Sequence, residues 1–380
     1  MSIVPADAVY LLWSILVALV AFGFWSEKHS NIGRNLTGIV IAMVSAMILS
    51  NLRLIPFTSD VYDTVFERVL PVAIPLMLFR ADLVEAFRKG GKTVVAFCIG
   101  AIGVVIGAFV ASLLIRLGDI SAVTAGLFTA TYTGGSANFA AVAISADFND
   151  SATLVSMVAA DIIATNLQTI FLIALPGIAI ARYVMRSDDD GIDASHGVGP
   201  ETAASADREF DLAGLSVSLA VALLLVYLGA ATAEYLDRPS LAIVCTTVYA
   251  LLVSNFCKPL VRIMSHDFEL GLFAIFLFLV ALAAGADVGH MLDSGLTFFV
   301  YALIMLLVHT VVIAVGARVF GLGLRNMVIG STACVGGVTS AAAIASAKGW
   351  RDLIVPGILA GTIGNAFGTL LGVWVWTILS

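Results

Sequence analysis

The stretch TATYTGGSANFAAVAISADFND, residues 129–150, decides how this chain is expected to fold, because a second stretch repeats its plan. The second stretch reads STACVGGVTSAAAIASAKGWRD and covers residues 331–352. Each contains small polar residues, a Gly-Gly pair, an Ala-rich run and a final Asp. When the glycine pairs are superimposed, four further pairs coincide: Ala140 with Ala342, Ala141 with Ala343, Ala143 with Ala345, and Asp150 with Asp352. This shared order indicates an internal duplication.

A Gly-Gly pair inside an apolar segment has two interpretations. Each glycine weakens a helix by about 1 kcal/mol, so the pair favours an unwound turn. Inside a membrane, the backbone groups freed by such a turn need polar partners, which a bound ion or solute supplies. The alternative is that the glycines only let neighbouring helices pack closely. We expect an unwound, ligand-binding element at both pairs.

Small polar side chains surround both glycine pairs and are the candidate substrate-binding groups. The half-helix after each pair begins with free N–H groups and a partially positive end, which favour an anionic group. The same residue types also cap helices without a ligand, so this alternative stays open. The predicted substrate-binding residues are Thr131, Thr133, Gly134, Gly135, Ser136 and Asn138 in the first stretch, and Gly336, Gly337, Thr339 and Ser340 in the second.

Asp161 is the most informative charged residue, because residues 154–180 contain no other ionisable group. A carboxylate at that depth in a membrane is costly unless it binds a proton, a cation or a hydrogen-bond donor. We therefore predict a proton or sodium site at Asp161, with Asn166 and Asn365 as further ion ligands. The alternative is a structural acid that only bonds to a neighbouring helix. No other metal and no cofactor is predicted.

The composition predicts an all-α polytopic membrane protein. Of 380 residues, 60% are hydrophobic and 12% are charged, whereas soluble domains are nearer half apolar and a quarter charged. The mean hydropathy is +1.05. Apolar blocks of about 17 to 30 residues are long enough to cross a hydrocarbon core as helices. About twelve such segments occur, at residues 8–25, 36–51, 64–80, 93–116, 121–147, 151–184, 212–236, 239–256, 267–288, 296–318, 323–347 and 350–379.

The segments form two halves, residues 1–186 and 212–380, which we interpret as homologous membrane repeats. Residues 187–211 between them are acidic and rich in small residues, and are predicted to be a flexible aqueous linker. Six crossings per half would leave the repeats parallel, whereas the loop charges lean towards inverted repeats. Either a miscounted segment or a re-entrant one would resolve this conflict, and the sequence leaves both open.

The first apolar segment is expected to be retained as a membrane helix, because it lacks the basic n-region of a signal peptide. Lys28 and Arg34 follow it, which places the N-terminus outside. We expect an integral protein of the bacterial inner (plasma) membrane, with the lipid bilayer and a small molecule or ion as partners.

Several functional classes lack their signatures in this sequence. No Walker A motif and no HExxH motif occurs, and no basic cluster indicates nucleic-acid binding. The scattered Cys98, Cys245, Cys257 and Cys334 form no CxxC pair and are expected to be core residues. We expect a protein that is not an enzyme. An intramembrane enzyme with Asp161 and His309 as its acid–base groups stays open as an alternative.

Four motifs, drawn from both halves, carry a family resemblance. They are LSNLRLIP at residues 49–56, LPVAIPLMLFRADL at 70–83, YTGGSANFAAVA at 132–143 and GGVTSAAAIASAKGWRDLIVPGILAGTIGNAFGT at 336–369. Together they resemble the uncharacterised YjcL-like membrane proteins, a family usually placed near the cation/proton antiporters and the bile-acid:sodium symporters. The resemblance covers nearly the whole chain outside residues 187–211.

The resemblance implies two inverted repeats and a homodimer. Each repeat would contribute one broken helix, and the two breaks would cross at mid-membrane in a core (transport) domain that moves against a scaffold domain. In related antiporters the helix after the break often carries an Asp-Asp or Asn-Asp pair. Here Ala160 precedes Asp161, and this departure favours a solute symporter.

The sequence and the resemblance together predict a sodium- or proton-coupled secondary carrier of a small anionic (carboxylate) solute, working by alternating access. A cation/proton antiporter is the alternative within transport. A channel built from the same broken helices is the alternative outside carriers.

Overall fold

The computed structural model describes residues 2–29, 38–177, 210–286 and 288–380. Helices, and no strands, form the regular structure of these residues. The predicted linker at residues 187–211 lies outside the described residues except for its last two.

Helices follow one another through both halves of the described chain. In the first half they are α1 (Val9–His29), α3 (Gly38–Asn51), α4 (Asp60–Thr64), a π-helical turn (Val65–Val69), α5 (Leu70–Leu78), α6 (Leu83–Lys89), α7 (Gly91–Leu114), α8 (Ser121–Gly134), α9 (Ser136–Ser145) and α10 (Ser151–Ala174). In the second half they are α12 (Leu212–Tyr235), α13 (Ala242–Phe256), α14 (Lys258–Ile263), α15 (Asp267–Ala284), α16 (Val288–Val319), α17 (Leu324–Val335), α18 (Gly337–Ala347) and α19 (Ile354–Leu379).

Seven of the described helices are long and apolar enough to span a membrane: α1, α7, α10, α12, α15, α16 and α19. Three shorter apolar helices, α3, α9 and α13, accompany them. The chain is therefore a polytopic helical membrane protein, as its composition predicted. The count of twelve hydrophobic segments as membrane crossings stays a prediction.

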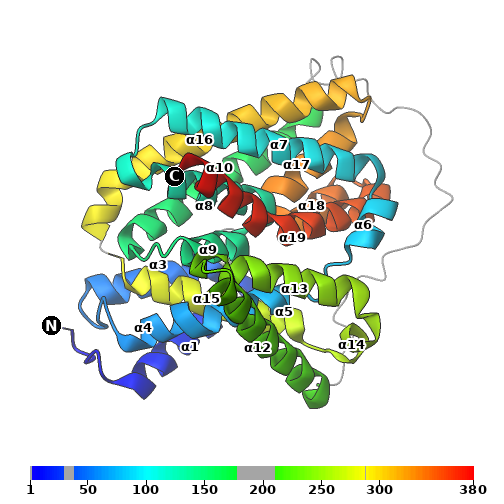
Figure 1. Ribbon diagram of the computed structural model, residues 1–380. Coiled ribbons are helices and arrows are strands. Elements are labelled where there is room, and N and C mark those ends of the chain that lie inside the picture. Colours follow the sequence, from blue (N-terminus) through cyan, green and yellow to red (C-terminus); the bar gives the residue numbers. More distant parts are fainter. Residues whose placement is uncertain (1, 30–37, 178–209, 287) are drawn as a thin grey trace.

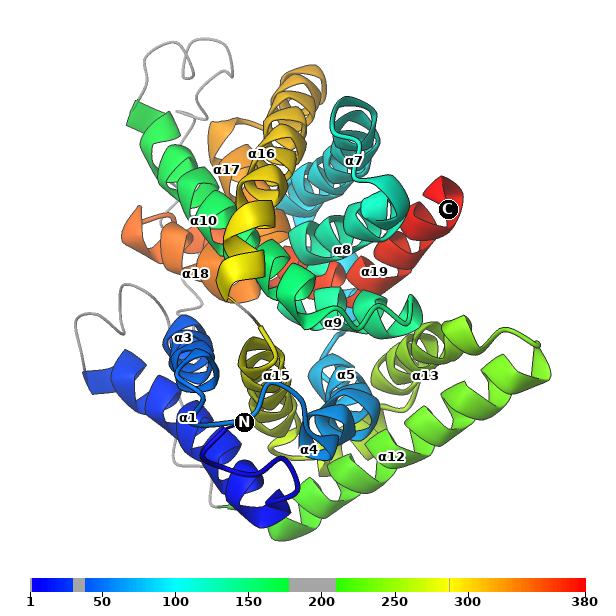
Figure 2. The same cartoon turned by 90° about the vertical axis from the view of Figure 1, so that its left-hand side faces the viewer.

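Two lobes divide the helices, and each lobe contains helices from both halves of the sequence. Lobe A, the lower lobe in Figures 1 and 2, contains α1, α3, α4, α5, α12, α13, α14 and α15. Lobe B, the upper lobe, contains α7 to α10 and α16 to α19. In lobe A, α5 packs against α15, and in lobe B, α7 packs against α16. The two sequence halves are thus interleaved in space.

The first Gly-Gly pair reverses the chain. α8 ends at Gly134, and Gly135 takes φ +82° and ψ −177° before α9 begins. A Cβ placed on Gly372 of α19 would lie 2.7 Å from Ala130 in α8 and also 2.7 Å from Val142 in α9. In a continuous helix Ala130 and Val142 would be about 18 Å apart. α8 and α9 therefore form a hairpin, hairpin 1.

The second Gly-Gly pair reverses the chain in the same way. α17 ends at Val335, and α18 begins at Gly337, whose φ is +76°. A Cβ on Gly357 of α19 would lie 2.8 Å from Ile329 in α17 and 3.3 Å from Ala341 in α18. α17 and α18 therefore form hairpin 2, and the equivalent glycines of the two aligned stretches both have a positive φ.

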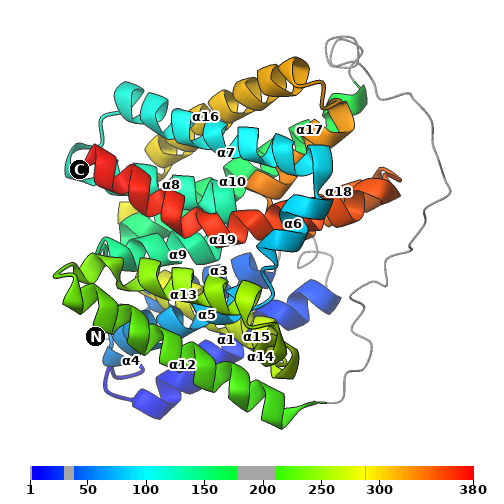
Figure 3. The ribbon, with the colours of Figure 1, turned by 45° about the vertical axis from the view of Figure 1, so that its right-hand side comes forward.

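The two hairpins enter the bundle from opposite ends. In Figures 1 and 3, α8 and α9 lie towards the end that carries both termini, whereas α17 and α18 lie towards the end that carries α6. The expectation of two broken helices that run on and cross is therefore wrong. Each segment turns back at its glycine pair, where the second glycine adopts a backbone conformation that other residues rarely take.

Gly135→Ala should lower the unfolding temperature of the purified protein. The added Cβ meets no atom within 4 Å, so the cost is backbone strain of about 1–3 kcal/mol. Gly349→Ala, at φ +71° and equally open, is the control for strain outside a hairpin. Gly295→Ala, in open space within α16 and without a positive φ, is the control without strain. In detergent, the unfolding temperatures of Gly135→Ala and Gly349→Ala should be lower than that of the wild type, and that of Gly295→Ala should not be. Equal unfolding temperatures of Gly135→Ala and Gly295→Ala would refute the strained turn.

Basic residues gather at the end of the bundle where hairpin 2 enters. Among the described residues, the loops and helix ends at that side carry Lys28, Arg80, Arg88, Lys89, Lys92, Lys258, Arg262, Arg318, Arg325, Lys348 and Arg351. The connections at the opposite end, after α3, before α8 and before α13, carry Arg53, Arg116 and Arg238, and Arg68 lies in the π-helical turn between α4 and α5. The positive-inside rule therefore predicts that hairpin 2 enters from the cytoplasm and that both termini lie outside.

Candidate functional site

A row of glycines on α19 receives the tips of both hairpins. A Cβ on Gly361 would lie 2.8 Å from the Cα atom of Val338 in α18. A Cβ on Gly364 would lie 2.1 Å from the carbonyl oxygen of Thr133 in α8, and one on Gly368 would also meet hairpin 1. Any side chain at these positions would displace a tip. Both tips therefore meet the middle of α19, inside lobe B.

One hydrogen bond joins the two hairpins directly. The Sγ of Cys334, in the last turn of α17, donates to the carbonyl oxygen of Tyr132 in α8 at 3.1 Å. Both residues are completely buried. The bond places the two chain reversals beside each other.

Asn138, a predicted substrate ligand, fixes the tip of hairpin 1. Its Nδ2 donates to the carbonyl oxygen of Gly134 at 2.6 Å. Its Oδ1 accepts hydrogen bonds from the backbone N–H of Thr369 at 2.8 Å and from the hydroxyl of the same residue at 2.6 Å. The buried amide thus ties the tip to α19 and has one N–H left to offer a ligand.

A small pocket lies between the lobes beside Asn138. Lobe A contributes Ile74, Met77 and Leu78 to its walls, and lobe B contributes Ala137, Asn138, Asn365 and Thr369. Its volume of about 10 Å³ is close to the space that one water molecule needs. Asn365, a predicted ion ligand, is therefore found in this pocket at the lobe interface. Its side chain makes no hydrogen bond to any residue the structure describes.

Three other predicted substrate ligands have free side chains. Ser136 and Thr339 are exposed and Ser340 is partly exposed. None of the three hydroxyls hydrogen-bonds to a residue within the described part of the chain. α9 has no side-chain cap, so helix capping does not account for Ser136. These hydroxyls are available to a ligand at the hairpin tips.

Hydroxyl groups surround the carboxylate of Asp161 in the middle of α10. The hydroxyl of Thr131, from α8, donates to Oδ2 at 3.1 Å, and the hydroxyl of Thr165, one turn further along α10, donates to Oδ1 at 3.0 Å. No Lys or Arg among the described residues forms an ion pair with Asp161. Carboxylate and hydroxyl oxygens without a neighbouring positively charged side chain suit a small hard cation or a proton.

Unsatisfied hydroxyls are concentrated on α8. Among the described residues, Thr124, Thr129, Tyr132 and Thr133 have buried hydroxyl oxygens without a hydrogen-bond partner. The hydroxyl of Tyr132 also lies close to the Asp161 carboxylate, outside the geometry of a normal hydrogen bond. A buried polar group left unpaired costs about 1–3 kcal/mol. The helix that leads into hairpin 1 therefore has polar groups that a bound ion or water would satisfy.

The structure does not bring all predicted ion ligands together. Asn166 is exposed on α10 and does not join the hydrogen-bonded group around Asp161. Sequence reasoning missed Thr165 and Tyr132. The spacing of four residues between Asp161 and Thr165 was the available signal for the first. No sequence signal marks Tyr132, because its proximity to Asp161 depends on the tertiary structure, which also brings Thr131 of α8 to the Asp161 carboxylate.

The aligned Asp150 and Asp352 have structural roles. The Oδ1 of Asp150 accepts hydrogen bonds from the backbone N–H groups of Ala152 and Thr153, which caps α10. Asp352 precedes α19 and forms an ion pair with Arg325 at the start of α17. Both acids therefore fix the helix that follows a hairpin.

His309 joins three helices of lobe B. Its Nδ1 lies 2.8 Å from the carbonyl oxygen of Gly100 in α7, and its Nε2 lies 2.8 Å from the hydroxyl of Ser331 in α17. Since a carbonyl can only accept, Nδ1 carries the proton. Nε2 can then accept from the serine, so a neutral imidazole satisfies both contacts.

Comparison with known proteins gives the chain a family. A family model described as "Protein of unknown function (DUF819)" matches residues 14–380. The chain is also 29% identical over 396 aligned residues to a protein of Bacillus subtilis (strain 168) described as "Uncharacterized membrane protein YjcL", with 98% of each chain covered. The resemblance inferred from the four motifs is thereby confirmed. The match over nearly the whole length, together with the apolar helices, identifies the chain as an integral membrane protein of the DUF819 family.

Proposed function

We propose that the protein is a secondary active carrier in which lobe B moves against lobe A and carries a small anionic solute with sodium or a proton. The observation that carries this proposal is the meeting of two hairpin tips beside a hydroxyl-lined carboxylate. A purely structural bundle gains nothing from buried hydroxyls without partners. A bound ion or solute would give these hydroxyls a partner.

The coupling ion binds at Asp161 in this proposal. The carboxylate and the hydroxyls of Thr131 and Thr165 supply oxygen ligands. Thr131 lies in the last turn of α8, and its carbonyl oxygen accepts a hydrogen bond from Gly135 at 2.8 Å. An ion at Asp161 therefore acts on the same turn that shapes the tip of hairpin 1, which links ion occupancy to the solute site.

The solute binds where the tips face lobe A. α9 and α18 begin at the tips, so their free N–H groups favour a carboxylate there. Ser136, Thr339 and Asn365 supply further donors that bond to none of the residues the structure describes. The apolar side chains of Ile74 and Met77 cover this site from lobe A. The small size of the pocket fits a closed state that opens when the lobes move.

Inverted repeats follow from the hairpins in this proposal. Each half then has five helical passages and one hairpin that returns to its own side: α1, α3, α4 with α5, α7 and α10 in the first half, and α12, α13, α15, α16 and α19 in the second. Because five is odd, the second half is inverted relative to the first. Lobe B is the core domain and lobe A is the scaffold, through which a homodimer would form.

Transport by purified protein in liposomes tests this function. A library of small carboxylates is offered with an inward sodium gradient, an inward proton gradient or neither. A carrier accumulates at least one solute above its external concentration while the gradient lasts, and an ionophore abolishes the accumulation. Flux that only equalises the concentrations, whatever the gradient, would show a channel and overturn the proposal.

Cation/proton antiport is the second candidate, favoured by one observation. Asp161 has no basic partner among the described residues, so one carboxylate can bind sodium and a proton in alternation. An antiporter moves protons out of liposomes when sodium is added outside, without any organic solute. A pH-sensitive dye inside the liposomes separates the two candidates.

A further inference from the structure

The two halves of the chain make the same contact with each other in opposite directions. Asn255, near the end of α13, donates through Nδ2 to the carbonyl oxygen of Ala81 at 3.0 Å and to that of Leu251 at 2.9 Å. Asn51, at the end of α3, donates through Nδ2 to the carbonyl oxygen of Ala286 at 2.9 Å and to that of Met47 at 2.8 Å. Each side-chain amide donates one hydrogen bond to a carbonyl oxygen of its own helix and one to a carbonyl oxygen of the other half.

The sequence around these contacts repeats as well. Ser precedes Asn at 50–51 and at 254–255, and Ala precedes Asp at 81–82 and at 286–287. The four residues therefore occupy equivalent places in the two halves. We call the two contacts the Asn clamps: the first holds Ala81 through Asn255, and the second holds Ala286 through Asn51.

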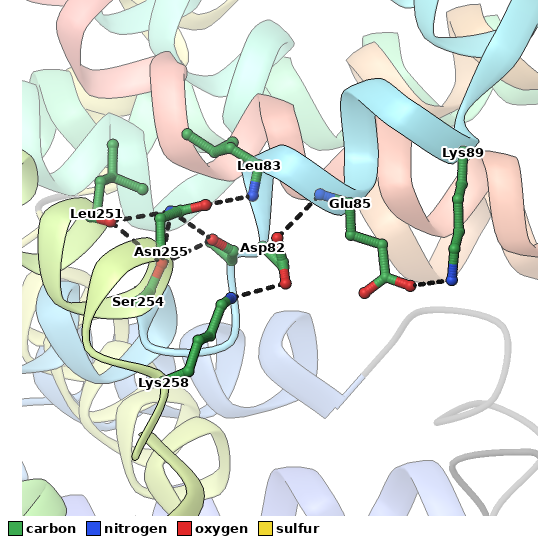
Figure 4. A network of polar contacts seen from close by, with 9 residues as sticks. Asp82, Leu83, Glu85, Lys89, Leu251, Ser254, Asn255 and Lys258 are labelled. Atoms are coloured by element: carbon green, nitrogen blue, oxygen red, sulfur yellow. Dashed lines mark hydrogen bonds and ion pairs between the residues drawn. The ribbon is translucent and has the colours of Figure 1, made fainter. Parts of the chain in front are cut away.

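The first clamp holds the backbone on both sides of Asp82 (Figure 4). Besides the bond from Asn255, the hydroxyl of Ser254 donates to the carbonyl oxygen of Ala81 at 2.7 Å. The N–H of Leu83 donates to the Oδ1 of Asn255 at 2.8 Å. Side chains of α13 thus hold the chain just as it leaves α5.

An ion pair reinforces the first clamp. Lys258 lies 2.7 Å from Asp82, which also caps α6 by accepting from the N–H of Glu85 at 2.9 Å. Burial raises the pKa of Asp82, but the hydrogen bonds from Lys258 and Glu85, together with the positive charges of Lys258 and Arg88, outweigh this, and the pKa lies below its ordinary value. The carboxylate is therefore charged at neutral pH and binds the lysine as an ion.

The clamped residues lie where the chain passes between the lobes. Ala81 belongs to the short connection from α5 in lobe A to α6 and α7, and Ala286 belongs to the connection from α15 in lobe A to α16 in lobe B. Both Asn residues belong to lobe A. Beyond the first clamp, Gly91 starts α7 at φ +52° with open space around it, so backbone freedom begins on the lobe B side.

We infer that the two Asn clamps are a pair of pivots that anchor two of the connections between the lobes, from α5 to α6 and from α15 to α16, to lobe A while lobe B moves. This inference rests on the lobe movement in the proposed function. Each pivot is built from both halves, so neither connection can shift without breaking a bond to the other half. Movement is then confined to the residues after each clamp, and the two pivots together restrict lobe B to one path.

Distance measurements between the lobes test the inference without any solute or ion gradient. Spin labels are attached to cysteines placed at Leu113 in lobe B and Tyr235 in lobe A, which are 80% and 90% exposed. The native cysteines are replaced in this background. Pulsed electron paramagnetic resonance then compares the lobe-to-lobe distances of the background, Asn255→Ala, Asn51→Ala and the double variant.

We expect each single variant to broaden the distance distribution and the double variant to broaden it most. Asn326→Ala is the matched control, because Asn326 donates to the carbonyl oxygen of Leu322, just before its own helix, and accepts from Thr93 of another helix, wholly within lobe B. Its distribution should match the background. Ser254→Ala removes the bond from Ser254 to Ala81 but keeps the bond from Asn255 to Ala81, and it replaces Asn255→Ala if that variant does not fold.

Distances that stay unchanged in all clamp variants, even where the unfolding temperature falls, would overturn the inference and leave the clamps as static braces. This result is independent of transport. Broadened distances in a protein that accumulates no solute would leave the pivots intact and reject the proposed function. Accumulation of solute together with unchanged distances would support the proposed function and reject the pivots.

Discussion

Gly364→Ala should displace hairpin 1 and strongly destabilise the protein. The added Cβ would lie 2.1 Å from the carbonyl oxygen of Thr133 and 3.1 Å from the ring of Phe97. A backbone carbonyl can move only with its helix, so α8 must shift away from α19. Overpacking of a tight core costs about 1–3 kcal/mol, and more when the neighbour is backbone. We expect a lower unfolding temperature and loss of accumulation in liposomes.

Gly295→Ala is the matched control for this substitution, because it adds the same methyl group to a helix where nothing lies within 4 Å. A helix gains up to about 1 kcal/mol from such a replacement, so the control should be at least as stable as the wild type. If Gly364→Ala unfolds at the wild-type temperature and keeps its activity, the contact between α8 and α19 is not as tight as described.

Asp161→Asn should abolish the response of the protein to its coupling ion. The carboxamide has nearly the shape of the carboxylate and can still accept from Thr131 or Thr165, but it cannot provide a negative charge. A ligand at a hundred times its dissociation constant stabilises the folded state by about 2.7 kcal/mol. The wild type should therefore unfold at a higher temperature when the coupling ion is added, and Asp161→Asn should not.

The measurement is thermal unfolding in sodium chloride against the same concentration of an organic-cation chloride, repeated across pH. Asp147→Asn, at an exposed loop position after α9, controls for the loss of one charge. Thr131→Val removes a hydroxyl at the same site and should weaken the response without abolishing it. Identical ion and pH responses in Asp161→Asn and the wild type would remove Asp161 from the ion site.

The sequence predicted the class of fold and the position of both chain reversals, but not their form. Hydropathy located the membrane helices, because their length and apolar character need no tertiary information. The Gly-Gly pairs at 134–135 and 336–337 marked the breaks. Nothing local distinguishes a kinked crossing helix from a hairpin, since that depends on the glycines of α19, more than twenty residues from the second break and more than two hundred from the first.

The candidate site was predicted only in part, again because some of its contacts depend on tertiary packing. Asp161 was identified because a lone carboxylate in an apolar run is unusual. Thr131 was predicted as a substrate ligand because it lies near a break, whereas its hydroxyl bonds to Asp161. Asn138 was expected to bind a ligand, yet it mainly fixes hairpin 1 to α19 through Thr369. Asn365 was assigned to the ion site and is found at the lobe interface instead.

Two hairpins that enter from opposite sides of the membrane are the central feature of the proposed carrier, and cysteine accessibility tests this arrangement directly. Single cysteines replace four exposed residues that flank the hairpins: Asp119 and Asp147 around hairpin 1, and Phe320 and Lys348 around hairpin 2. Intact cells are treated with a membrane-impermeant maleimide before and after permeabilisation. The account predicts that positions 119 and 147 react from outside and that positions 320 and 348 react only after permeabilisation. Opposite behaviour of the two positions that flank one hairpin would show a helix that crosses the membrane, and would contradict the account.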